Sequence, residues 1–499
     1  MRQTLWGVVC LSAVAVQAGW AADPSVTIYN QNFAVVRQTI PLTLEKGVNK
    51  VSFNDTTTLL EPDSVMLRDP SGKWALQILE QSFRNDPVSQ ELLLSINEGQ
   101  TIPFLQTIGQ NQTTVDGKIV RSGYIPQIIR ARNPQQQYYP QLTNAQPVIE
   151  VDGKIRFGLP GQPLFPSLGD GTILKPTLSW VLDSAAAGTL EAELGYVTSG
   201  MSWESSYNLV APQSGDTVDI VGWVTIENMS GKVFENAHIK LMAGNVSKIQ
   251  PGPDMNRYVM ADTGGFAGRY GGEQAVTQKA FDEYHLYTIA RPATLRDRET
   301  KQVEFVRANG VKSERFYVYD GAKIDVNQYR GWNPQNLLQQ QDYGTQMNTQ
   351  VWTMRELKNT KDNGLGMPLP AGRTRFYQRD DDGQLEFTGE NVIAHTPSDE
   401  TLRVYTGDAF DLVGERRQTS FKVENQQRWV DESFEIKLRN RKKEDTEIRI
   451  VEHLYRWSTA EVKESSDPYN KMDSQTIEFR VPVKPGEEKV VTYTVHYSW

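Results

Sequence analysis

Three consecutive carboxylates form the sharpest chemical cluster in the sequence. Asp380, Asp381 and Asp382 follow Arg379 and precede Gly383. Carboxylate oxygens are ligands that Ca²⁺ prefers, but the EF-hand spacing fails because the glycine comes too early and no glutamate occupies the twelfth loop position. A solvated hairpin turn is therefore favoured, and we assign no metal ligand.

The histidines and possible nucleophiles form no recognisable catalytic motif. The five histidines are far apart in the sequence: His238, His285, His395, His453 and His496. The His-Glu-x-x-His zinc motif and the Gly-x-Ser-x-Gly elbow are both missing. A carboxylate pair for glycoside hydrolysis is assembled by the fold, so 61 Asp and Glu neither identify nor exclude one. We assign no catalytic or cofactor-binding residue, and a carboxylate-dependent hydrolase of envelope glycan or peptide stays an alternative.

The composition excludes several classes of protein. The chain has 499 residues, with 52 Lys+Arg against 61 Asp+Glu and a formal net charge of -9. A nucleic-acid partner is excluded because it would need a basic surface. The one cysteine excludes a disulfide framework, a Cys-ligated zinc site and an iron–sulfur cluster. At roughly 150 residues per domain, the length suggests two to four domains.

The N-terminus has the three parts of a secretory signal peptide. An apolar run from Leu5 to Val16 follows a basic residue and precedes small residues. Cleavage after Ala21 is favoured, because cleavage after Ala22 would put the bulky Trp20 at a small-residue position. The sequence thus predicts a signal peptide over 1–21 and export to the periplasm or the outer envelope.

Removal of the signal peptide would also remove the only cysteine. Cys10 lies in the middle of the apolar run, and a lipoprotein acylation site would lie at its end. A cysteine-free mature chain suits an oxidising compartment. No later segment reaches about 18 consecutive apolar residues, so no transmembrane helix is predicted in the mature chain.

Alternation of apolar and polar residues dominates the chain and predicts half-buried antiparallel strands. It is clearest in 218–226, 434–439, 446–451 and 476–483. Turns are predicted at three Asp-Gly pairs, 116–117, 152–153 and 382–383, the second within a hairpin over 148–157. One short helix is predicted over 89–98, with Ser89 as its cap and Leu92, Leu93 and Ile96 on its apolar face.

The predicted fold class is mainly β, with tandem immunoglobulin-like β-sandwich modules, a small strand-rich insert and long polar loops. The predicted parts are the signal peptide, an N-terminal β module (22–90), a small β insert (91–175), a β-sandwich domain (176–415) and a C-terminal β-sandwich module (416–499). Two polar stretches without periodicity, 251–278 and 327–350, predict long loops or segments that order on binding.

Two further patterns concern strand ends. Val224-x-Ile226-x-Asn228 and Ile436-x-Leu438-x-Asn440 both end an alternating strand in Asn, which either module duplication or convergence explains. The chain ends in an alternating aromatic and aliphatic row, 491–499, which suits either the last strand of a sandwich or a lipid-facing strand of an outer-membrane β-barrel. The sandwich is favoured because other strands are short and the connections carry charge runs such as 439–445.

One resemblance rests on the segments 196–207, 222–245, 287–295, 301–303, 370–383 and 407–412. Together these segments resemble a bacterial envelope family of unknown function, the mucoidy-inhibitor-A-like proteins (domain of unknown function 4139). The resemblance covers about 176–499. Longer members of the family insert a coiled coil, and no heptad run is found here. The resemblance implies an envelope location but no chemistry, because the family has no assigned reaction.

The residues that carry the resemblance are interpreted as structural. They are Tyr196, Gly200, Trp203, Tyr207, Trp223, Asn228, Lys301 and Gln302. Large aromatics fill sandwich cores, and Gly200 predicts a bulge or turn with an unusual backbone. An aromatic platform for a sugar is the alternative.

The sequence thus favours a non-enzymatic exported envelope protein, without cofactor, that binds or scaffolds an envelope protein or glycan. Recognition would use the loops 251–278 and 327–350, since loops on rigid sandwiches commonly carry function. The envelope hydrolase and the outer-membrane barrel are the alternatives.

Overall fold

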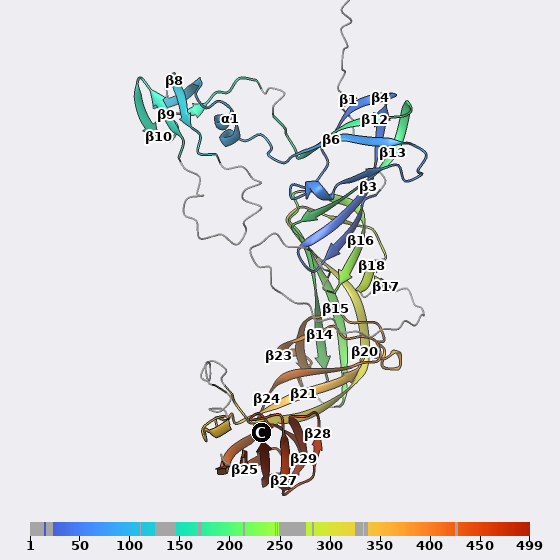
Figure 1. The fold of residues 1–499 in the computed structure, drawn as a ribbon, viewed down its shortest axis with the longest axis vertical. Helices are drawn as coiled ribbons and strands as arrows, with labels where there is room; N and C mark the ends of the chain where they lie inside the picture. Colours follow the sequence, from blue (N-terminus) through green and yellow to red (C-terminus); the bar gives the residue numbers. More distant parts are fainter. Residues whose placement is uncertain are drawn as a thin grey trace, which may run out of the picture. The chain divides into compact units, whose positions relative to one another are not determined.

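A computed structural model describes residues 14–15, 23–109, 111–124, 146–167, 172–212, 215–244, 246, 248, 276–281, 284–324, 333, 338–424 and 428–499. The predicted fold class, mainly β with sandwich-type modules, is confirmed (Figure 1). The predicted cleavage position at Ala21 and Ala22 lies outside the described residues, as does most of the polar stretch 251–278.

The chain divides into two compact units. Unit 1 comprises Met1–Trp203 and Ile226–Lys301, and unit 2 comprises Glu204–Thr225 and Gln302–Trp499. Three strands each contain residues of both units: β14 (Met201–Ala211), β15 (Thr217–Asn228) and β20 (Glu299–Asp320). The finer division predicted from the sequence, with boundaries near 90, 175 and 415, stays a prediction.

Unit 1 contains a four-stranded and an eight-stranded sheet. The first has the order β1 (Val14–Ala15), β4 (Gly47–Phe53), β12 (Thr177–Ser184), β6 (Leu76–Arg84). The second has the order β17 (Val276–Phe281), β18 (Tyr284–Ile289), β16 (Phe234–Ala243), β2 (Ser25–Tyr29), β3 (Phe33–Leu44), β13 (Gly188–Ser199), β5 (Met66–Arg68), with β19 (Ala293–Leu295) beside β16. Strand β2 pairs in parallel with β16 and β3 pairs along its whole length with β13, so distant segments build this sheet.

A smaller sheet in unit 1 has its own apolar core. Its order is β10 (Lys154–Phe157), β9 (Val148–Val151), β8 (Asn111–Arg121), β7 (Thr101–Ile108), β11 (Gln162–Pro163). The predicted helix is confirmed as α1 (Gln90–Ile96), whose cap Ser89 accepts a hydrogen bond from the Leu92 amide at 3.2 Å. Its predicted apolar face is wrong in part: Leu94 is the buried residue and Ile96 is 50% exposed, because Leu94 packs into the core of this sheet.

The three Asp-Gly pairs have different outcomes. Asp152 and Gly153 form the predicted turn of the β9–β10 hairpin, with φ of 51° and 71°. The turn at 382–383 is also confirmed, between β22 and β23. The pair 116–117 is not a turn but lies inside β8, because Gly117 leaves room for the side chains of Phe104 and Ile149.

Substitution of Gly117 by alanine is expected to destabilise the small sheet by about 1–3 kcal/mol, the usual cost of overpacking. A Cβ at this position would lie 2.8 Å from atoms of both Phe104 and Ile149. Hydrogen exchange at the amides of β7 and β8 measures the effect, with the exposed Thr114→Ala as the control. Equal exchange in the two variants would contradict the expected clash.

Unit 2 is built on one extended sheet. Its order is β23 (Leu385–Ile393), β22 (Gly372–Arg379), β14, β15, β20, β21 (Gln350–Lys358), β24 (Thr401–Glu424), β25 (Trp429–Asn440), β30 (Glu488–Ser498), β27 (Ala460–Ser465). Strands β26 (Thr446–His453), β28 (Tyr469–Lys471) and β29 (Thr476–Val483) pair off this path. Buried and exposed residues alternate along β15 and β25, as the sequence predicts.

The last strand contributes to a packed core. Its alternate residues, Val491, Tyr493, Val495 and Tyr497, are buried together with Phe434, Ile436, Phe479 and other apolar residues, and Trp499 packs against the same core. The apolar row at the end of the sequence therefore faces a buried core of unit 2.

The two strands that end in Asn share a turn geometry, which we call the asparagine corner. In both, the side-chain amide donates to the carbonyl four residues on, and the side-chain oxygen accepts from the amide two residues on: Asn228 with Lys232 and Ser230, Asn440 with Glu444 and Lys442. Both asparagines are buried. The sequence echo thus corresponds to one repeated piece of structure.

Candidate functional site

Several residues of the family-like segments meet in unit 1 around the first asparagine corner. Tyr196 and Asn228 are each 1% exposed. Gly200, in the turn between β13 and β14, has a φ of 81°. Lys232, four residues after Asn228, is also buried. We call this group, with the segment 55–61 that packs on it, the corner site.

The segment 55–61 is held by the corner through main-chain contacts. The Thr58 amide donates to the Ser230 carbonyl at 2.8 Å, and the Ser199 amide donates to the Leu59 carbonyl at 3.1 Å. The Lys232 ammonium donates to the Asp55 carbonyl at 2.8 Å and forms an ion pair with the Asp55 carboxylate.

Glycine is required at two positions of the corner site. A Cβ on Gly231 would overlap the Thr58 side chain, and a Cβ on Gly200 would lie 2.8 Å from the Met229 carbonyl oxygen. Both glycines have positive φ, a backbone conformation that other residues rarely adopt. The backbone of the corner is therefore shaped to accept a neighbouring chain segment at close range.

The electrostatics of the corner site follow from its burial. Burial lowers the pKa of the Lys232 ammonium, and the facing Asp55 charge opposes that shift. Burial raises the pKa of the Tyr196 phenol, and Asp55 raises it further, so this group stays neutral. A buried amine with a lowered pKa can serve as a base, but here Asp55 holds the Lys232 ammonium. The arrangement is suited to clamping a chain segment.

The other predicted residues lie elsewhere and do not join the corner site. Trp203 donates to the Met242 carbonyl at 3.2 Å and packs on Tyr287. Tyr207 donates to the Pro370 carbonyl at 2.6 Å and meets Phe305 edge-on. Trp223 is half-buried on β15, Lys301 pairs with Glu299 at 3.2 Å, and Gln302 donates to Thr225 at 3.1 Å.

Among the described residues of unit 2, two ion pairs are fully buried, and neither was predicted from the sequence. Arg416 on β24 lies 2.9 Å from Glu452 on β26, and Arg456 lies 2.7 Å from Glu432 on β25, with all four side chains at most 1% exposed. Burial alone would lower the pKa of Arg416, but Glu452 raises it overall, so the pair stays charged. The sequence contains an indication of this burial. Glu432 falls among the alternate residues of β25 that are buried, and the residues two positions before and after it, Val430 and Phe434, are apolar.

These two arginines also hold part of the polar stretch 327–350. Arg416 donates to the Gly344 carbonyl at 3.0 Å, and Arg456 donates to the Gln340 and Tyr343 carbonyls at 2.8 and 3.2 Å. Gly344 packs directly on the Tyr455 ring, where a Cβ would overlap it. Residues 340–344 of this stretch are thus held against other parts of unit 2.

The histidines form separate contacts. His496 pairs with Asp431 at 2.5 Å, and Asp431 also meets Lys463 at 3.3 Å. His453 pairs with Asp320 at 3.1 Å, and His395 accepts from the Ala371 amide. Among the described residues no group of three or more His, Cys, Asp or Glu could hold a metal ion, and the carboxylates 380–382 lie at the β22–β23 turn.

The His453–Asp320 pair predicts a pH dependence of stability. The hydrogen bond to Asp320 raises the pKa of His453 above its ordinary 6.5, against the opposing effect of burial. The contribution of the His453–Asp320 pair to the free energy of unfolding is therefore fully present below the pKa that His453 has in the unfolded chain. It is lost as pH rises through the higher pKa of His453 in the folded chain. Urea unfolding should show His453→Asn less stable than the parent at acidic pH, with the difference vanishing at alkaline pH. A difference independent of pH would contradict this.

The family-like segment 407–412 forms a protruding bulge in β24. Trp352 of β21 pairs with Asp408 and Gln350 pairs with Val413, so a single β21 residue faces 409–412. Such a bulge redirects side chains. Phe410 is 96% exposed as a result. We call residues 408–411 the Phe410 bulge.

The Phe410 bulge is fixed on both sides. Asp408 accepts hydrogen bonds from the Tyr405 hydroxyl at 2.9 Å and the Gln350 amide at 2.8 Å. Burial and that hydrogen bond raise the pKa of Tyr405, so its phenol stays a donor. On the other side Leu412 is buried in the C-terminal core. The exposure of Phe410 could not be predicted from the sequence, because residues 408–411 interrupt the alternation of apolar and polar residues from which burial is predicted.

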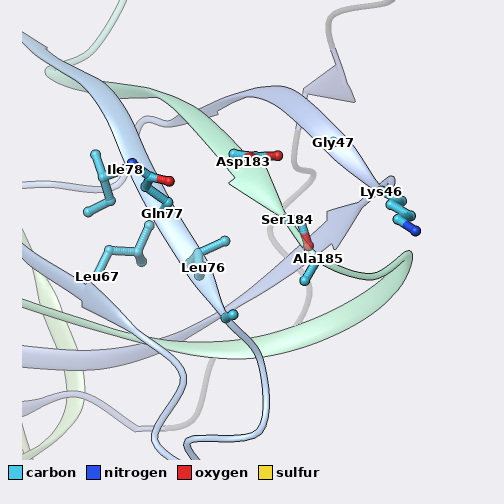
Figure 2. A pocket seen from close by; sticks show the side chains of 10 residues that line it. Lys46, Gly47, Leu67, Leu76, Gln77, Ile78, Asp183, Ser184 and Ala185 are labelled. Atoms are coloured by element: carbon cyan, nitrogen blue, oxygen red, sulfur yellow. The ribbon is translucent and has the colours of Figure 1, made fainter.

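Unit 1 has an open groove of about 1050 Å³, shown in Figure 2. Its lining residues are Lys46, Gly47, Leu67, Ala75, Leu76, Gln77, Ile78, Asp183, Ser184 and Ala185. They come from the ends of β4, β12 and β6 and from β5. The groove is thus partly apolar, with one exposed cation and one exposed anion, Lys46 and Asp183.

The fold and these sites define a mainly β protein of sandwich-type modules. Several of its family-like residues hold together segments of the chain that are far apart in the sequence. The family model described as Domain of unknown function (DUF4139) matches residues 192–499, so the chain belongs to the DUF4139 family. The narrower mucoidy-inhibitor-A-like description stays a prediction. A search of the curated proteins finds no match. In the part of the chain that the structure describes, no helix is long and apolar enough to span a membrane.

Proposed function

We propose that this chain is an exported protein of the bacterial envelope that binds or scaffolds an envelope component and is not an enzyme. One observation carries the proposal. The family-like residues whose side chains could do chemistry, Asn228 and Lys232, are hydrogen-bonded within the fold at the corner site, and Tyr196 is buried there. The segment 55–61 that they hold lies before the matched range 192–499.

The Phe410 bulge supports a binding role. The Phe410 residue is 96% exposed and so buries almost none of its surface in unit 2, whereas Leu412, two residues along the strand, is buried in a core. Buried aromatic anchors dominate the binding energy of protein interfaces. Fixing the anchor beforehand reduces the conformational entropy lost on binding.

Export is supported by the N-terminal sequence and is tested by fractionation. We expect osmotic shock or outer-envelope extraction to release the protein, and N-terminal sequencing of that product to begin at Ala22. A product that stays with the cytoplasmic fraction and begins at Met1 would contradict the proposal.

Binding is tested by photo-cross-linking in living cells. A photoreactive residue at position 410 should give cross-linked products, whereas the same residue at Val392, another exposed apolar residue on a strand, should give none. Equal patterns at both positions would contradict a binding role for the bulge.

An enzymatic role is tested at Lys232. The pair Lys232→Met and Asp55→Asn both weaken the ion pair, but only the first removes the amine. Under the proposal, each variant restores the envelope properties of a strain that lacks this chain as well as the parent does, at temperatures where the variant stays folded. Loss of function in a folded Lys232→Met protein alone would favour catalysis by the amine instead.

A further inference from the structure

We infer that Arg355 and Arg315 of unit 2 form a binding site for a phosphate group. The two arginines lie on β21 and β20, which pair side by side (Figure 1). The inference goes beyond the proposed function, because it adds a ligand site that depends neither on export nor on the Phe410 bulge.

Arg355 is the exception among the buried charged residues. In the part of the chain that the structure describes, seven other charged residues are buried and each forms an ion pair: Lys232, Arg416, Glu432, Arg449, Glu452, Arg456 and Glu478. Arg355 is only 7% exposed, and none of the described carboxylates forms an ion pair with it. A charge buried without a counter-charge is costly. The described residues thus supply this buried cation with no counter-ion.

The Arg355 guanidinium is held weakly and stays within reach of solvent. It donates to the Ser313 carbonyl at 3.4 Å, which is long for such a bond. Neither its Nε nor its Nη2 is among the fully buried side-chain atoms that lack a partner, so these two donors reach the surface. An atom of a ligand can therefore approach the guanidinium although most of the residue is buried.

Arg315 adds a second guanidinium at the same place. It lies directly opposite Arg355 in the register of β20 and β21, and directly opposite residues of an antiparallel pair point to the same face. Arg315 is exposed, and it also forms no ion pair with a described carboxylate. Like charges directly opposite each other are destabilising. The register thus concentrates positive charge at one place on the sheet, and an anion there would relieve the repulsion.

The groups around Arg355 leave this charge only partly offset. Burial lowers the pKa of Arg355 and the Arg315 charge lowers it further, whereas Asp216 and Tyr317 act in the opposite direction. Asp216 is exposed and forms no ion pair with a described Lys or Arg. The hydroxyl of Ser313, on the same face as Arg315, is buried and has no partner among the described residues. Three donor side chains therefore share this place with one carboxylate at longer range.

A phosphate group fits this arrangement better than other anions. Guanidinium groups bind phosphate oxygens through paired, charge-assisted hydrogen bonds. A terminal phosphate carries a charge of about −1.5 to −2 at pH 7, which matches two arginines, whereas a carboxylate carries a single charge. Because Arg355 is mostly buried, the ligand must be the free ion or the terminal group of a larger molecule. A terminal phosphate is the chemistry that inorganic phosphate and a lipid headgroup share.

Calorimetric titration of the full chain with inorganic phosphate tests the site. The parent chain should bind, and Arg355→Met and Arg315→Met should each weaken binding at least about tenfold, because each removes hydrogen bonds to a charged group. Arg417→Met is the control, since the Arg417 side chain is 71% exposed and pairs with Glu435. It should leave binding unchanged. No binding by the parent chain, or equal losses in all three variants, would overturn the inference.

Thermal unfolding with and without phosphate shows whether the folded variants respond to the ligand. Phosphate should raise the Tm of the parent chain, because a ligand that binds the folded state stabilises it, and should not raise the Tm of Arg355→Met. Asp216→Asn removes the opposing carboxylate and should tighten phosphate binding. If Asp216→Asn instead lowers the Tm without phosphate and leaves binding unchanged, Asp216 is the counter-ion of Arg355 and the inference is wrong. Acetate that binds as tightly as phosphate would also overturn it.

Co-sedimentation with vesicles identifies the source of the phosphate. Phosphatidylcholine vesicles that contain phosphatidic acid present a terminal phosphate. If they bind the parent chain and not Arg355→Met, the site takes a lipid headgroup, and if they bind neither while inorganic phosphate binds the parent, it takes the free ion. Both results support the site. Phe410→Ala should leave phosphate binding unchanged, so a failure of this inference is distinguishable from a failure of the binding role of the Phe410 bulge.

Discussion

Replacement of Arg416 by methionine is expected to destabilise unit 2 by about 3–5 kcal/mol, because it leaves the Glu452 carboxylate buried without a counter-charge. The side chains of the pair are at most 1% exposed, and the Tyr493 hydroxyl also donates to the Glu452 carboxylate at 2.5 Å. The same substitution removes one of the two side-chain hydrogen bonds to the Gly344 carbonyl, which keeps the bond from the Tyr455 hydroxyl at 3.3 Å. Urea unfolding followed by tryptophan fluorescence measures the loss.

Arg417 provides a matched control one residue along the strand. It pairs with Glu435 at 3.0 Å, but its side chain is 71% exposed. Arg417→Met should therefore cost less than about 1 kcal/mol, since exposed ion pairs contribute little. The double variant Arg416→Met with Glu452→Met should recover most of the stability, because it removes both buried charges. Equal losses of unfolding free energy for Arg416→Met and Arg417→Met would contradict the larger cost that we expect for a buried carboxylate without a counter-charge.

Substitution of either corner asparagine by alanine is expected to destabilise the protein by about 2–4 kcal/mol, because each buried polar group left without a partner costs about 1–3 kcal/mol. The Asn228 amide donates to the carbonyls of Lys232, Leu295 and Arg296, and its oxygen accepts from Ser230. Asn440 makes the corresponding bonds to Glu444 and Val483. Chemical unfolding of both variants measures the effect.

The exposed Asn470 of β28 is the control, and Asn470→Ala should change stability by less than about 0.5 kcal/mol. The aspartate variants Asn228→Asp and Asn440→Asp keep the acceptor and remove the donor, so they should also lose stability. A loss confined to one corner would contradict the equivalence of the two corners.

Local structure could be predicted correctly from the sequence where a strand buries only one of its faces, because the apolar residues then alternate with polar ones. The alternation of β15 and β25, the hairpin at Asp152-Gly153 and the capped helix α1 all follow from short-range rules. Gly117 fails the turn rule because its use is tertiary: it makes room for Phe104 and Ile149, which come from other strands.

The sites were less accessible to sequence reasoning, for a related reason. The echo of Asn228 and Asn440 located both corners, since each corner is built from neighbouring residues. The contact of Lys232 with Asp55 joins residues separated by 177 positions, and no local pattern reports it. The buried charges of Arg416 and Glu432 resemble solvent-facing residues unless their register is counted against the apolar row.

The assembly of unit 1 from distant segments sets an order of events for a chain that crosses a membrane from its N-terminus. Strand β2 pairs with β16, β3 with β13, and the segment 55–61 with the turn at 228–232. The early strands would therefore arrive on the far side with their apolar faces uncovered and their partners still to be translocated. Such non-local pairing is slow and exposes the chain to aggregation. An exported protein of this topology should depend on a holding chaperone until residues up to about 300 have emerged.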